Sequence, residues 1–434
     1  MGQEINDANR LLIRAVIMQN GGGPVCPLLH DILWTMHQAD DTLISFFTPT
    51  LRHATFLFID PIQNEVVLLL RRLRDVCPSL EKIDFDPGSE PDAALSLMQE
   101  LARFPRLRQI KVSECWGLKA FQVLAMKPSL DCLRISAFIG PWAGLRDVIS
   151  VRDLRELSVG GDASCLSSLF TVARFYALKS ANIYVDSSEA ETSLTVADIT
   201  SLLSLFYNAV SASGLQNFEF APWPHRYEAP FDVKPPLCEL IAPILPIRDL
   251  RSFTLTAKYP VASLDDEDVK ALASAWSQLQ HFSANRGSFT SGSSVSLCAL
   301  HHLHSHCTDL LELSIPRIRW PTIGVDAIPA PLDRSESPAH PLQELSLPSQ
   351  VVPKTDLPLP GSPAELSDEG AEAIATYLLA LFPRLDLDRC KCVWDGSRPR
   401  EGAMRFGTNS ARRRGLGPKD LHFDDRWTIV GRRS

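Results

Sequence analysis

The chain has 434 residues, of which 45% are apolar and 22% are charged. These fractions are close to those of folded globular proteins, so they exclude a chain that is disordered throughout. The formal net charge is −8, which argues against a general nucleic-acid binder, because such a protein needs a strongly basic surface.

The N-terminal segment, residues 1–23, does not look like a secretory signal. It lacks a basic region followed by an unbroken apolar run, and it carries four charged side chains, Glu4, Asp7, Arg10 and Arg14. No stretch of the sequence approaches 18 uncharged apolar residues, so we expect no membrane-spanning helix. We expect residues 1–23 to be disordered.

Ten cysteines are scattered along the chain. In a chain of this length, such a distribution indicates small buried hydrophobic residues in a reducing compartment, and it does not indicate a disulfide framework. We therefore place the protein in the cytoplasm or the nucleus.

From residue 29 onward one pattern recurs: a leucine, two variable residues, an apolar residue, a polar residue and a second apolar residue. We call the leading leucine of each copy the anchor leucine. The mean interval between anchors is about 28 residues, within the 20–29-residue period of leucine-rich repeats. Two weaker copies begin at Leu29 and Leu51, and ten clear copies begin at Leu80, Leu107, Leu130, Leu154, Leu178, Leu215, Leu250, Leu279, Leu310 and Leu342.

The alternating apolar residues after each anchor predict a short strand that is buried on one face. Helical apolar spacing lies between the strands, for example over residues 90–104, 198–210 and 265–276. A unit of one strand and one helix cannot bury both of its apolar faces unless neighbouring units stack. The predicted fold is therefore an α/β leucine-rich-repeat solenoid, with a curved parallel sheet on the concave side and helices on the convex side.

The predicted solenoid covers residues 24–390. Two proline-rich insertions interrupt it, near 221–246 and over 316–363. A helix predicted over 367–381 would close the array. Residues 391–434 carry many arginines, and we expect them to form a disordered basic tail. Within this tail, Arg412-Arg413-Arg414 has two interpretations, a nuclear signal or nucleic-acid patch and an unstructured basic segment, and we favour the unstructured segment.

The phrases CPSLEKI at 77–83, FPRLRQI at 104–110 and VRDLREL at 151–157 resemble the leucine-rich-repeat superfamily in its ribonuclease-inhibitor-like form. The match is closer to the irregular repeats of fungal F-box/leucine-rich-repeat proteins. The resemblance covers about residues 24–390 and implies substrate recognition for a cullin-RING (F-box-type) ubiquitin ligase. No F-box is recognisable in residues 1–23, so either the chain is a truncated gene product or the protein works without an F-box.

The predicted binding surface is the concave face of the sheet. Side chains that flank the second apolar position of each strand point outward there and align in columns about 4.8 Å apart. Their mixed polarity suits recognition of a protein surface; the alternative is a solvated face without a partner. The candidate binding residues are Lys82, Asp84, Asp86, Gln109, Lys111, Arg134, Glu156, Ser158, Asn182, Tyr184, Asn217, Glu219 and His281.

A Cys/His-rich segment, residues 298–307, offers the strongest metal candidate. On a helix, Cys298, His302 and His306 share one face with a spacing that suits zinc ligands. The alternative, which we favour, is a repeat helix with solvated histidines, because no second cluster supplies the remaining ligands. The acidic run at 265–268 has two interpretations, a cation site or the N-terminus of a helix, and we favour the helix.

The sequence contains no nucleophile elbow, Walker A loop, dinucleotide fingerprint or zincin motif. We therefore expect a non-catalytic protein–protein interaction module with no cofactor and no membrane association. Two alternatives stay open: a repeat scaffold or regulator with no ligase link, and a metal-dependent enzyme that uses residues 298–307.

Overall fold

The computed structural model describes most of the chain from residue 7 to residue 386. Among the described residues, no helix combines the length and apolar character that crossing a membrane requires. The described ranges are 7–21, 23–36, 41–58, 63–86, 91–139, 148–186, 194–223, 234–257, 260–284, 288–290, 293–316, 318–319, 340–346 and 376–386.

One parallel sheet of twelve strands runs through the described chain. Strands that follow one another along the chain are also neighbours in this sheet. The α/β class predicted from the repeats is confirmed. The strands are β1 (Asp31–Met36), β2 (His53–Phe58), β3 (Lys82–Asp86), β4 (Gln109–Trp116), β5 (Cys132–Ile139), β7 (Glu156–Gly161), β9 (Ser180–Asp186), β10 (Asn217–Trp223), β11 (Ser252–Leu255), β12 (His281–Ala284), β14 (Glu312–Ser314) and β16 (Glu344–Ser346).

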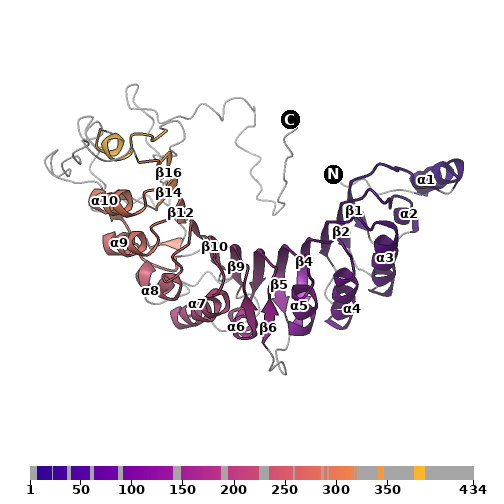
Figure 1. Cartoon of the computed structure of the whole chain (residues 1–434), viewed down its shortest axis with the longest axis horizontal. Coiled ribbons are helices and arrows are strands. Elements are labelled where there is room, and N and C mark those ends of the chain that lie inside the picture. Colours follow the sequence, from indigo (N-terminus) through magenta and orange to yellow (C-terminus); the bar gives the residue numbers. More distant parts are fainter. Residues whose placement is uncertain are drawn as a thin grey trace, which may run out of the picture.

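Helices lie along one side of the sheet, and the row of repeats bends into an arc with the strands on its inner side (Figure 1). Two short parallel pairs stand apart from the main sheet: β6 (Ile149–Val151) with β8 (Ala173–Phe175), and β13 (Val295–Ser296) with β15 (Ile318–Arg319). The helices are α1 (Asp7–Gln19), α2 (Asp41–Ile44), α3 (Gln63–Val76), α4 (Pro91–Ala102), α5 (Gly117–Ala125), α6 (Ala163–Val172), α7 (Val196–Val210), α8 (Leu237–Ile241), the short 3-10 helix η1 (Ala242–Ile244), α9 (Asp266–Ala275) and α10 (Leu297–His306).

The anchor leucines set the register of the whole array. All twelve predicted anchors lie two residues before the first residue of a strand of the main sheet. Eleven of them are at most 1% exposed, and Leu29 packs against the same core from a half-buried position. Strand pairing aligns equivalent positions of successive repeats, as in Ile83 opposite Ile110 and Ile110 opposite Leu133. The predicted repeat pattern is confirmed.

A thirteenth anchor, Leu385, extends the array beyond the predicted last repeat. Its amide donates to the carbonyl of Phe382 at 3.0 Å, and the amide of Asp386 donates to the carbonyl of Gln343 at 2.9 Å. The amide of Gln343 makes the equivalent bond to Leu311 at 2.9 Å. The phrase FPRL at 382–385 repeats the one at 104–107, a signal that sequence reasoning missed.

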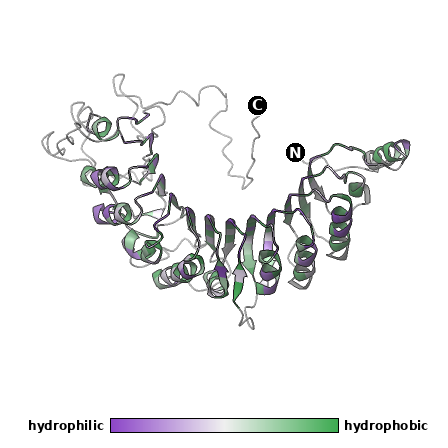
Figure 2. Ribbon diagram, in the orientation of Figure 1, coloured by the Kyte–Doolittle hydropathy of each residue, from purple (hydrophilic) through white to green (hydrophobic). Residues whose placement is uncertain are grey.

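The core between sheet and helices is apolar and continuous, whereas the helices also carry hydrophilic residues (Figure 2). Aromatic rings connect several repeats. Phe206 of α7 lies 5.2 Å from Phe170 and 5.0 Å from Phe218, measured between ring centroids, and Phe253 lies 5.1 Å from Trp276. Since each ring buries a large apolar area, these contacts stabilise one repeat against the next.

The acidic run at 265–268 begins α9, as the favoured interpretation predicts. Asp265 is the N-cap, and its carboxylate accepts from the amide of Asp268 at 3.0 Å. Asp268 also accepts from the amide of Cys238 in α8 at 2.8 Å, and Asp266 accepts from the amide of Ser296 beside α10 at 2.6 Å. The run therefore satisfies backbone amides at the N-termini of three neighbouring helices, where such groups lack intrahelical partners.

The structure describes only parts of the segments that the sequence predicts to lie outside the regular repeats. Residues 1–23 were expected to be disordered, yet Asp7–Gln19 form α1, which contacts α2; aliphatic side chains at helical spacing explain the helix. Within 221–246, the second half forms α8 and η1, and Leu237 and Ile244 are buried in the core. Of the predicted helix 367–381, residues 376–381 are helical. Most of the insertion 316–363 and all of the tail 391–434 lie outside the described residues.

A bulge near the middle of the sheet explains the glycine pair of β7. The pairing of β5 with β7 shifts register between Ile135 and Phe138. A Cβ atom on Gly160 would lie 2.1 Å from the carbonyl oxygen of Ser136. No residue with a side chain fits this close approach of two backbones.

We predict that Leu178→Ala lowers the free energy of unfolding by about 2–5 kcal/mol, because the anchor is fully buried and the truncation leaves a cavity. The matched control Leu68→Ala removes a side chain that is 55% exposed and should cost less than about 0.5 kcal/mol. Urea unfolding of both variants checks this. Equal losses would contradict the role of the anchor.

Candidate functional site

The candidate site is the face of the sheet that points away from the core, which we call the open face. After the anchors from Leu29 to Leu310, the third and fifth residues point into the core, as Ile83 and Phe85 do after Leu80. The second and fourth residues point the other way, because side chains alternate along a strand. Strand pairing aligns these outward positions into two columns that cross the whole sheet.

All thirteen predicted binding residues lie on strands of the main sheet. Tyr184 lies six residues after its anchor, and Asp86 ends β3, although the structure does not describe its side chain. The second-position column holds Lys82, Gln109, Glu156, Asn217 and His281. The fourth-position column holds Asp84, Lys111, Arg134, Ser158, Asn182 and Glu219.

In the N-terminal half of the open face, charged residues pair with one another across strands. The Lys111 ammonium lies 3.1 Å from the Asp84 carboxylate, and the Arg134 guanidinium lies 3.8 Å from the Glu156 carboxylate. Three of these four side chains are about half-exposed, and Asp84 is less so, and each pair contributes at most about 1 kcal/mol to stability. A partner's charges can therefore exchange with them at small cost.

The centre of the open face holds a tyrosine–carboxylate pair. The Tyr184 hydroxyl donates to Oε2 of Glu219 at 3.5 Å, and both residues are half-buried. Burial raises the pKa of Glu219 above its usual value. Burial, and then the neighbouring Glu219, raises the pKa of Tyr184. Tyr184 is paired with Gly160 of β7, and its Cβ lies 3.6 Å from the position that a Cβ on Gly160 would occupy.

In the C-terminal half of the open face, the sequence predicts only Asn217, Glu219 and His281, and the structure adds further residues. Small hydroxyl side chains occupy the fourth position in four successive strands, and the His281 ring lies 3.2 Å from the Glu312 carboxylate. These residues can be identified from the sequence because each lies two or four positions after its anchor leucine. The additional open-face residues are Ser252, Thr254, Ser283, Glu312, Ser314, Glu344 and Ser346.

The metal candidates Cys298, His302 and His306 all lie on α10, and Leu300 and Leu303 point into the core. The His302 and His306 rings are 6.3 Å apart, and Nδ1 of His306 lies 3.0 Å from the carbonyl oxygen of His302. Cys298 is exposed. Within the described ranges, no group of three or more Cys, His, Asp or Glu residues is arranged to hold a metal ion.

The cysteines of the described part are free thiols, and most are buried, as their distribution predicts. Burial raises the pKa of Cys77 to about 11 and the pKa of Cys115 to about 12. Buried thiols with such raised pKa values are unreactive at neutral pH.

A second histidine feature, not visible from the sequence, fastens the last repeats to α10. His340 is 4% exposed, accepts from the amide of Leu342 at Nδ1 (3.2 Å) and donates from Nε2 to the carbonyl of Cys307 (3.0 Å). Its ring lies 5.0 Å from those of His304 and Phe382. These two hydrogen bonds require the neutral ring, because a protonated Nδ1 cannot accept.

We predict that acid weakens this contact. Burial lowers the pKa of His340 from 6.5 to about 4; the bond to Cys307 and the nearby Asp309 oppose this shift, and His304 adds to it. The unfolded chain therefore binds this proton more readily, so stability is full above about pH 6.5 and falls as the pH drops toward about 4. We expect His340 to contribute a loss of about 2 kcal/mol between about pH 7 and about pH 5.

The measurement is urea unfolding at both pH values for the wild type and His340→Gln. The variant should be less stable at neutral pH and should lose less stability on acidification. His53→Gln, which changes an exposed ring, is the control. The same pH dependence in the wild type and in His340→Gln would contradict the assignment.

Comparisons with known proteins add little to this geometry. No family model matches the sequence, and no curated protein matches it. A solved structure of a leucine-rich-repeat (LRR) protein from Leptospira interrogans covers 70% of this chain and 92% of its own length, with 11% sequence identity and a TM-score of 0.17. This likeness is too weak to support an argument about the fold or the site.

Proposed function

We propose that the protein is a non-catalytic leucine-rich-repeat solenoid that binds another protein on the concave, open face of its sheet. The observation that carries the proposal is the open face itself. Twelve strands present aligned polar side chains there, and the helices lie on the other side (Figure 1).

The size of this face favours a macromolecular partner. Eleven strand intervals of about 4.8 Å give a surface about 50 Å long. That length matches a protein–protein interface and exceeds what a small ligand can contact. Exposed charge pairs and hydroxyl groups would supply specificity along it.

The centre of the open face holds a residue that is suited to dominate the binding energy. Tyrosine side chains dominate interface energetics because they combine a large apolar area with one hydrogen-bonding group. Tyr184 is half-buried and held by Glu219, so little side-chain entropy is lost when a partner covers it.

A narrower role, substrate recognition for a cullin-RING ligase in the cytoplasm or nucleus, is supported by the sequence resemblance alone. Co-purification of a cullin and its small adaptor with the full chain tests it. Absence of both would favour a scaffold or regulator with no ligase link.

We predict that Tyr184→Ala weakens capture of the specific partner by about 30-fold or more, the loss typical of a central interface tyrosine. The matched control is Tyr176→Ala, which removes a 49%-exposed tyrosine from the turn after β8, away from the open face. Quantitative mass spectrometry of proteins captured by both variants and the wild type identifies the partner. Direct titration with the purified partner measures the loss.

Thermal unfolding of Tyr184→Ala must first show that the variant is folded. If every protein captured by the wild type is retained equally by Tyr184→Ala and by Glu219→Gln, the open face is not the binding surface.

A further inference from the structure

A row of side chains follows the edge of the sheet at which the strands begin. It consists of the residues that come directly after the anchors, and backbone hydrogen bonds connect it from repeat to repeat. The amide of Lys179 donates to the carbonyl of Arg155 at 2.8 Å, and Gln216 donates to Lys179 at 2.9 Å. Arg251 in turn donates to Gln216 at 2.7 Å. Arg155, Lys179 and Arg251 therefore lie within about three strand spacings, or about 14 Å.

The charges of this row are balanced in its first part and unbalanced in its second. Arg52 lies 3.6 Å from Glu81, and Arg108 lies 3.7 Å from Asp131. Arg155 and Arg251 are exposed, and neither forms an ion pair with a carboxylate of the described residues.

The second part of the row is basic even though the chain as a whole carries a net charge of −8. Lys179 contacts the carbonyl of Gly214 through its ammonium at 3.1 Å and is otherwise exposed. The turns before the anchors Leu154 and Leu250 add two further exposed arginines and two exposed aspartates. We call the resulting cluster of five cations the basic row: Arg152, Arg155, Lys179, Arg248 and Arg251, with Asp153 and Asp249 among them.

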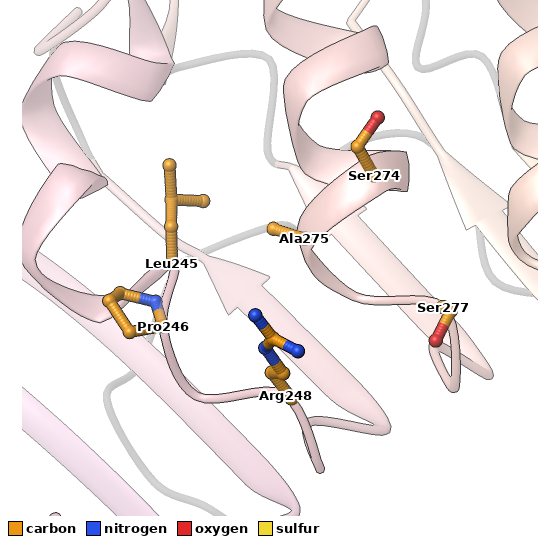
Figure 3. A pocket seen from close by; sticks show the side chains of 6 residues that line it. All are labelled: Leu245, Pro246, Arg248, Ser274, Ala275 and Ser277. Carbon is orange, nitrogen blue, oxygen red and sulfur yellow. The ribbon is translucent and has the colours of Figure 1, made fainter.

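A cleft of about 470 Å³ adjoins the basic row between η1 and the end of α9 (Figure 3). Leu245 and Pro246 line one side and Ala275 the other, with Ser274 and Ser277 nearby. Arg248 belongs to both features, because it lines the cleft and lies three residues before Arg251. The basic row is thus adjacent to a cleft that carries both aliphatic and polar side chains.

We propose that the basic row and its cleft form a second docking surface, distinct from the open face, for an acidic segment of a partner protein that carries an aliphatic side chain. Carboxylates of the segment would pair with Arg155, Lys179 and Arg251. The aliphatic side chain would occupy the cleft beside Leu245 and Ala275.

The composition of the surface favours an acidic peptide over a nucleic acid. Carboxylates on one side of an extended chain recur about every 7 Å, so about three of them span the row. A single strand of nucleic acid is held by aromatic stacking as well as by cations. Among the described residues near this part of the edge, Tyr176 is exposed and aromatic, which offers a stacking surface for about one base. The cleft offers aliphatic surface from Leu245, Pro246 and Ala275 and no aromatic ring. A short acidic segment matches both the number of cations and the cleft.

The test measures binding of a fluorescein-labelled peptide of six glutamates with one leucine at each end to the full chain. Arg155→Gln with Arg251→Gln should weaken binding by about tenfold, because neither cation forms an ion pair with a carboxylate of the described residues. The matched control, Arg52→Gln with Arg108→Gln, makes the same change at equivalent positions whose cations are already paired. This control should bind as the wild type does.

Two further probes make the outcome decisive. A peptide with serines in place of the leucines should bind several-fold more weakly, because it cannot fill the cleft. Raising the salt concentration from about 0.05 M to about 0.3 M should weaken binding of both peptides. Equal loss in the two double variants, no loss in either, or tighter binding of a ten-nucleotide thymidine strand would overturn the proposal. Tyr184→Ala should leave peptide binding unchanged, so this test is separate from that of the open face.

Discussion

The curved shape of this repeat array depends on the difference between the spacing of neighbouring strands and the spacing of packed helices. Neighbouring strands in a sheet lie about 4.8 Å apart, whereas packed helices need about 8–10 Å. Repeats that contribute one strand and one helix can stack without gaps only if the row bends with its strands inside (Figure 1). Buried anchors such as Leu178 and Leu215 hold each repeat at that spacing. The bend therefore results from close packing of wide helices beside narrow strands. No helix covers the strand side of the described repeats (Figure 1).

The same constraint separates the residues that make the fold from those free to vary. Positions three and five after an anchor are committed to the core, as in Phe218 and Phe220. Positions one, two and four contact solvent in nearly every described repeat, with the buried Cys132 as an exception, so most of them can change without a packing cost. The open face and the basic row are therefore surfaces on which partner specificity can change while the repeat is retained. A parallel sheet fixed by many backbone hydrogen bonds also presents these side chains with little mobility, which lowers the entropic cost of binding.

The part of the fold that is local in sequence could be predicted, and the part that depends on distant contacts could not. Every anchor from Leu29 to Leu342 was identified because the pattern of one strand fits within six residues. Leu385 was missed although its phrase was available, because a long proline-rich segment separates it from the preceding anchor. The close approach of Gly160 to Ser136 depends on a bulge in the neighbouring strand, and no pattern within either strand encodes it. The contacts of His340 likewise join segments more than 30 residues apart.

The charge balance of the edge shows why the candidate sites were harder to predict than the fold. Arg108 and Arg155 stand in nearly identical phrases, LRQI and LREL, directly after their anchors. Arg108 pairs with Asp131 in the next repeat, whereas the residue next to Arg155 in the following repeat is Lys179, 24 residues away in the chain. Asp131 also neighbours Arg155 from the preceding repeat, but its carboxylate pairs with Arg108. An arginine that is paired and one that is available to a partner therefore look alike along the sequence. They differ in the residues that lie beside them in the adjacent repeats, and these residues are known only once the register of the strands is known.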